Sequence, residues 1–180
     1  LKIPKHYDIS RNFPSELDNT DEVYFPPVFN QTGGSCSQAS GVAYTFTYEI
    51  NFLRGLVSDV PENLYPSHFT YNFLNKGDGA NGSNYNDGWR IIKEMGCPTQ
   101  NIYGGLAPIG NEGWMSGYNN YYSAMSNVVY NYYNIDVSTP EGLNTLKGWF
   151  LNHLNDSLSV GGLAVFSCGS SDMVVKHLPL

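Results

Sequence analysis

The sequence carries few positive charges and no long apolar run, and both shortages exclude classes of partner. Nine Lys and Arg stand against sixteen Asp and Glu in 180 residues, which gives a formal net charge of −7. Nucleic acids and anionic membranes attract basic surfaces, so we expect neither as a partner. A membrane-spanning helix needs about 18 or more consecutive apolar residues. No stretch of the chain approaches that length, so we expect no membrane span.

Cysteine and histidine are also scarce. The chain has three cysteines and four histidines, and no cysteine has a partner at the Cys-x-x-Cys spacing typical of zinc sites. The carboxylates form no metal-loop spacing either. We therefore expect neither a metal nor a cofactor. Cys97 and Cys168 are either paired with each other or two free thiols, because sequence alone does not fix connectivity.

The remaining cysteine, Cys36, follows Gly-Gly-Ser and precedes a helical pattern. Apolar residues recur at intervals of three and four after Gln38 and as far as Leu53, which predicts a core-facing helix at about 36–55. A thiol reacts as the thiolate, and the positive end of a helix favours that anion. The pattern is therefore typical of a nucleophilic cysteine.

The loop ahead of Cys36 supplies other groups that a nucleophile needs. Gly33 and Gly34 allow a tight backbone that brings an incoming carbonyl close to the thiol. The side-chain amide of Gln31 is a candidate donor to a developing oxyanion. The alternative is a small buried cysteine after an ordinary glycine-rich turn. The glutamine and the glycines favour chemistry over that alternative.

Several segments, taken in order, resemble the papain-like cysteine peptidases. Gly34-Ser35-Cys36 matches the Gly-Ser-Cys that precedes the central helix of that family. Further similar segments are the opening Leu-Lys-Ile-Pro-Lys-His-Tyr-Asp at 1–8, Pro-Pro-Val-Phe-Asn-Gln at 26–31, the block at 63–72 in the style of bacterial members, the loop and helix at 81–98, and Gly-Gly-Leu-Ala-Val-Phe at 161–166. Together these segments cover nearly the whole chain.

The resemblance implies a thiol-dependent endopeptidase of the secreted bacterial type. Cys36 would attack a peptide carbonyl to form an acyl-enzyme, and its backbone N–H and the Gln31 amide would hold the oxyanion. The implied substrate-binding residues are Gly34, Ser35, Gly82 and Ser83, of which the last two match the family's Gly-Gly loop and would bond an extended peptide or protein substrate. The expected location is secreted, periplasmic or at the cell surface. A start at Leu1 reflects either proteolytic processing or an artificial boundary.

The implied fold is α+β and two-lobed, with residues 1–180 forming part of one domain. An N-terminal helical lobe would face a C-terminal lobe made of an antiparallel β-sheet, incomplete in this chain. Further helices are expected at about 63–75, 86–95 and 140–154, the second capped by Ser83 or Asn84 and the third by Ser138 or Thr139. Strands are expected in the second half of 114–133, after a loop, and at 161–167.

The general base is missing from the pattern. The family's His-Ala strand and Asn-Ser-Trp turn do not occur here, and we interpret His177 as a loop residue. We therefore expect the catalytic His and Asn, with the rest of the sheet lobe, on a second chain or in a missing segment, and residues 1–180 alone to be inactive. The alternative is a catalytically silent binding protein on the same fold. Ser37 in place of the family's Trp, the missing His and Asn, and the middle segment rich in Tyr and Asn favour it.

Overall fold

The structure is a computed structural model that describes residues 12–104 and 117–167. Over these two ranges the chain forms helices and loops, and no residue belongs to a strand. The expected α+β fold with an antiparallel sheet lobe is therefore wrong, because the described part of the chain is all-helical. No helix in that part is long and apolar enough to cross a membrane.

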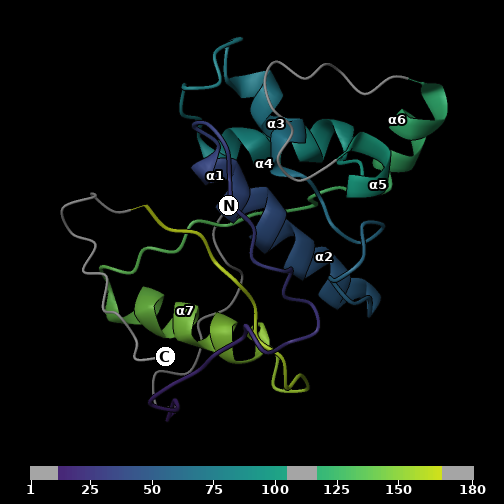
Figure 1. Cartoon of the computed structure of the whole chain (residues 1–180). Helices are drawn as coiled ribbons and strands as arrows, with labels where there is room; N and C mark the ends of the chain where they lie inside the picture. The colour runs from purple at the N-terminus through teal and green to yellow at the C-terminus, as the bar shows by residue number, and fades with distance from the viewer. Residues whose placement is uncertain (1–11, 105–116, 168–180) are drawn as a thin grey trace.

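A continuous helical run through the middle of the molecule carries Cys36 at its first position (Figure 1). The run consists of α1 (Cys36–Gln38), the π-helix η1 (Ala39–Phe46) and α2 (Thr47–Arg54), so the predicted helix at 36–55 is confirmed. Side chains bind carbonyls of the wide π turns. Trp89 Nε1 donates to the Gly41 carbonyl at 2.9 Å, and Thr47 Oγ1 donates to the Val42 carbonyl at 3.2 Å.

Four shorter helices gather on one side of this run (Figure 1). They are α3 (Ser67–Leu74), α4 (Tyr85–Met95), α5 (Gln100–Tyr103) and α6 (Tyr118–Ala124). The first two confirm the helices expected near 63–75 and 86–95, and the Asn84 side chain caps α4 by accepting from the Asn86 N–H. The main core cluster lies between them and the central run: Val42, Phe46, Ile50, Tyr65, Phe69, Ile92 and Cys97.

Helix α7 (Pro140–Asn152) lies on the other side of the run (Figure 1). The Thr139 hydroxyl accepts from the Gly142 N–H, so the predicted cap and the predicted helix are confirmed. His153, just after the helix, joins it to α2: its Nε2 lies 2.9 Å from Glu49 Oε2, and its ring stacks on Phe52 at 4.2 Å between centroids. This polar and aromatic contact fixes α7 against the central run.

Both predicted strands are wrong. In the segment 161–167, side chains take the backbone groups that a neighbouring strand would use: the Tyr48 hydroxyl donates to Gly161 O at 2.7 Å, Glu49 Oε1 accepts from Leu163 N at 2.7 Å, and Trp149 Nε1 donates to Leu163 O at 2.8 Å. In the other segment, α6 occupies residues where a loop was expected, and residues 128–133 pair with no described strand.

Candidate active site around Cys36

Cys36 is exposed at the N-terminal end of the central run. Backbone N–H groups at such an end are unpaired and carry partial positive charge, which favours an anion there. Ser35 precedes it and is fully buried, with its hydroxyl donating to the Thr32 carbonyl at 2.7 Å. The Ser35 hydroxyl therefore closes the turn ahead of the thiol, and Ser35 offers no exposed surface to a substrate.

The loop that leads to Cys36 packs directly on the segment 78–82. Gly34 N donates to the Gly79 carbonyl at 2.9 Å, and a Cβ on Gly34 would lie 2.3 Å from the Asn81 carbonyl oxygen. Gly33 has φ +63° and its Cβ would lie 2.3 Å from the Gly79 oxygen. Both glycines are therefore required by contact between two loops, in addition to any approach by a substrate.

Tyr71 of α3 joins the same two loops. Its buried hydroxyl lies 2.7 Å from the carbonyl oxygens of both Gly79 and Asn81, to which it donates, and it accepts from Gly34 N at 3.1 Å. One hydroxyl proton serves two acceptors, so the three backbone groups are held around a single atom. This contact fixes the loop before Cys36 relative to the segment that precedes Gly82.

Gln38 makes a second connection between the two segments. It is fully buried, and its Nε2 donates to Ser83 Oγ at 3.1 Å and to the Asn84 carbonyl at 2.9 Å. Its Oε1 accepts from Thr70 Oγ1 at 2.8 Å. Gly82 and Ser83 are thus held beside the first turn of the helix that carries Cys36.

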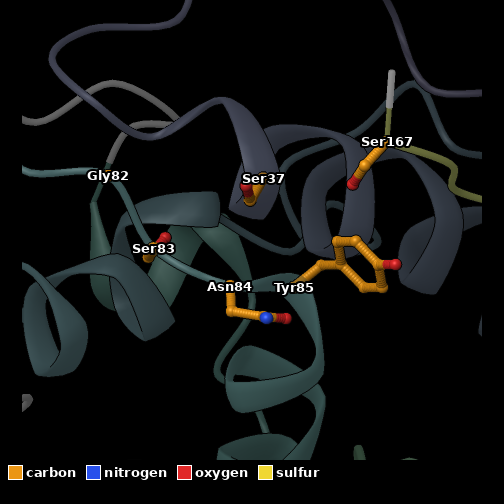
Figure 2. A pocket seen from close by; sticks show the side chains of 6 residues that line it. All are labelled: Ser37, Gly82, Ser83, Asn84, Tyr85 and Ser167. Carbon is orange, nitrogen blue, oxygen red and sulfur yellow. The ribbon is translucent and has the colours of Figure 1, made fainter. Parts of the chain in front are cut away.

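A hollow of about 420 Å³ opens next to this turn (Figure 2). Its lining residues are Ser37, Gly82, Ser83, Asn84, Tyr85 and Ser167. Figure 2 shows Ser37 and Ser167 on one side and the segment 82–85 on the other. Gly82 is exposed, and a Cβ there would meet nothing within 4 Å, so its backbone is open to a ligand. The two predicted substrate-binding residues of this loop therefore line a depression that also contacts Ser37, the residue after Cys36, whereas Cys36 itself is not among the lining residues.

Gln31 and the histidines complete the candidate set. Gln31 is exposed, five positions before the thiol. The ring nitrogens of His68 lie 3.1 Å from Thr32 Oγ1 and 3.3 Å from Ser67 Oγ. Those of His153 lie 2.9 Å from the Val160 carbonyl and 2.9 Å from Glu49 Oε2. His6 and His177 fall outside the described residues. In the described part, both histidines thus use both ring nitrogens for contacts with other polar groups.

The two described thiols differ sharply. Cys97 is a free, fully buried thiol in the core, and burial raises its pKa well above the ordinary value. Cys36 is free and exposed. Cys168, the other half of the possible pair, lies outside the described residues. Across residues 12–104 and 117–167, no group of three or more His, Cys, Asp or Glu could hold a metal ion.

The sequence patterns did not identify Gln38, Thr70 or Tyr71. Each lies on a buried face of a predicted helix, where a polar residue within an apolar pattern signals an internal hydrogen bond. That signal was present in the sequence at Gln38, two positions after the thiol. The partners of these residues come from loops, and periodicity carries no information about loop contacts.

Comparisons with known proteins identified no relative of this chain. No family model matches the chain, and neither a curated protein nor a solved structure matches it.

Proposed function

We propose that this chain is a thiol-dependent peptidase that cleaves peptide bonds through an acyl-enzyme on Cys36. The observation that carries the proposal is the one exposed thiol of the described residues, at the start of the central helical run and one residue before Ser37, which lines a hollow together with Gly82 and Ser83. The motif-level resemblance to papain-like cysteine peptidases supports the same assignment.

In the proposed reaction, the Cys36 thiolate attacks the carbonyl carbon of a peptide bond. The Cys36 N–H and the Gln31 amide donate to the oxyanion that forms, the C–N bond breaks, and the amine leaves with a proton. Water then hydrolyses the thioester and releases the acid. Exposed backbone at Gly82 would bond the extended substrate chain.

A general base is needed for both steps, and we propose that a second chain supplies it. The engaged ring nitrogens of His68 and His153 support this, because each would have to break existing contacts to accept the thiol proton. As an extension of the same proposal, the protein acts outside the cytoplasm on peptide or protein substrates.

The test is acylation by an activated ester, since its good leaving group needs little help from a general acid. The protein is treated with a p-nitrophenyl ester of a blocked amino acid, and the adduct is located by peptide mass mapping. We expect a thioester on Cys36 and none in Cys36→Ala, with Cys97 as the internal control thiol. Equal acylation of Cys97, or no adduct on Cys36, would refute the assignment.

The engaged histidines also favour a second candidate, a catalytically silent peptide-binding protein. Such a protein would bind peptides equally well as wild type and as Cys36→Ala, and it would form no thioester. Isothermal titration of both proteins with the same peptide, read alongside the acylation experiment, separates the two functions.

A further inference from the structure

We propose that Gln38 is a positioning residue that sets the spacing between the Cys36 thiol and the substrate-binding loop at Gly82 and Ser83. The inference rests on the proposed peptidase function and adds to it a residue that carries no reactive chemistry of its own. Gln38 follows Cys36 by two positions, so the two side chains leave the helix about 200° apart. The Cys36 side chain is exposed, and the Gln38 side chain is fully buried.

The contacts of Gln38 define its amide orientation. Nε2 faces a carbonyl oxygen at Asn84, which only a donor can satisfy, and its second proton reaches Ser83 Oγ. Oε1 receives the Thr70 hydroxyl proton. All the hydrogen-bonding capacity of the Nε2 group is used, and both of its bonds end on the loop adjacent to Gly82.

Packing leaves the amide no other position. A Cβ on Gly88 of α4 would lie 1.9 Å from Gln38 Oε1, so the Gln38 side chain packs directly against the backbone of Gly88. Thr70 on α3 and Gly88 on α4 therefore hold the amide from two helices, while its donors hold the loop. A change in the Gln38 side chain should displace Ser83 and Asn84 first. Thr70 and Gly88, on the other side of the amide, belong to packed helices.

The substitution Gln38→Glu isolates this role. Glutamate has nearly the same shape, and its carboxylate still accepts from Thr70 and can accept from the Ser83 hydroxyl, but it cannot donate to the Asn84 carbonyl. A carboxylate oxygen would face the Asn84 carbonyl oxygen at the 2.9 Å of the present bond, which is repulsive. The loop should move away from Cys36, while the exposed thiol at the helix start remains unchanged.

Asn51 offers a matched control on the same helical run. It is also fully buried, and its Nδ2 donates to a serine hydroxyl, Ser58 Oγ at 2.7 Å, and to a backbone carbonyl, Asn63 O at 2.7 Å. Asn51→Asp therefore makes the same chemical change, from amide to carboxylate, at the far end of the run. It should lower stability without moving the loop at Gly82.

The experiment measures alkylation of Cys36 by a dipeptidyl chloromethyl ketone and by iodoacetamide. The peptide reagent binds before it reacts, so its rate saturates with a dissociation constant KI and a maximal rate. Iodoacetamide reports the thiol alone. For Gln38→Glu we expect KI to rise about tenfold, as loss of the hydrogen bond to Asn84 and the repulsion that replaces it predict, with the maximal rate and the iodoacetamide rate unchanged. Asn51→Asp should keep the wild-type KI.

Two results would overturn the inference alone: an unchanged KI in Gln38→Glu when the wild type saturates, or an equal rise in Asn51→Asp. Wild-type labelling that never saturates would overturn the peptidase proposal and this inference with it. If Gln38→Glu does not fold by circular dichroism, Thr70→Val takes its place, because it frees Gln38 Oε1 without touching the loop. A rise of about threefold in KI is then expected, and no rise would refute the inference.

Discussion

Replacing Gly34 by alanine tests the close contact between the two loops at the candidate site. The new Cβ would lie 2.3 Å from the Asn81 oxygen, 2.6 Å from the Asn81 carbonyl carbon and 2.9 Å from the Ala80 oxygen. All three are backbone atoms, so no side chain can swing aside. The loop 78–82 must therefore shift as a unit, which strains its bonds to Gly34 N and Tyr71.

The expected cost follows from overpacking, which is typically about 1–3 kcal/mol. Alanine also restricts the unfolded chain and returns about 0.4–1 kcal/mol. The free energy of unfolding should therefore fall by about 1–2 kcal/mol, and Tm by about 2–8 °C for a chain of this length. Alkylation of Cys36 by the peptide reagent should weaken as well, because Gly82 moves with the loop.

The assay is urea unfolding together with thermal melting, with Gly79→Ala as the control. Gly79 lies in the same loop, yet a Cβ there would meet nothing within 4 Å. We expect Gly79→Ala to match or slightly exceed the wild type in stability. If Gly34→Ala were as stable as Gly79→Ala, the loops would not be in contact and the described site would be incorrect.

Three further predictions concern Cys97, Gln31 and Glu49. Because the buried Cys97 thiol keeps its proton in the folded protein above the ordinary pKa of 9.0 while the unfolded chain loses it, the free energy of unfolding should fall as pH rises through that value. The free energy of unfolding should fall by up to about 1.4 kcal/mol per pH unit from this thiol. Urea unfolding between pH 8 and pH 10 should show a smaller dependence on pH in Cys97→Ala than in the wild type. An equal dependence in both proteins would count against burial of the thiol. Gln31→Ala should lower the rate of acyl-enzyme formation by on the order of 10²-fold with little change in substrate affinity, as measured by stopped-flow with the activated ester; an unchanged rate would exclude Gln31 as the oxyanion donor. Glu49→Gln should cost about 1–3 kcal/mol in urea unfolding, because it weakens the contacts with His153 and Leu163 N, whereas Glu62→Gln on the exposed surface should cost almost nothing.

Sequence patterns predicted the longer helices because these have local signals, whereas the short helices α5 and α6 were not predicted. Thr139 before Pro140 marks the start of α7, and Asn84 marks the start of α4, since a side-chain oxygen there satisfies an unpaired N–H of the first turn. These signals need only neighbouring residues. The helix from Cys36 onward was likewise predicted from spacing alone.

The prediction of a strand at 161–167 was wrong because the side chains that bond this segment are distant in sequence. Its apolar, glycine-containing pattern is typical of a buried strand, but Tyr48, Glu49 and Trp149 satisfy its backbone instead. An apolar run specifies burial, and it does not specify whether a strand or a set of side chains provides the hydrogen bonds. The candidate site divides in the same way: Cys36, Gly82 and Ser83 came from motifs, whereas Gln38 and Tyr71 required the fold.

The π-helix between Cys36 and α2 changes which residues of the run face the core, compared with a uniform α-helix of the same length. An i→i+5 turn holds one residue more than an α turn, so a helical wheel drawn at 100° per residue from Cys36 loses register within Ala39–Phe46. Leu53, which that wheel places on the buried face, is 76% exposed. Deleting one residue from this stretch would let a wide turn close to an α turn, and the two ends of the run would keep nearly their present directions because the extra residue occupies the same turn. Deleting a residue from the α-helical part, Thr47–Arg54, would instead turn one end by about 100° relative to the other, so the π-helix is the part of the run that tolerates a change of length without turning Cys36.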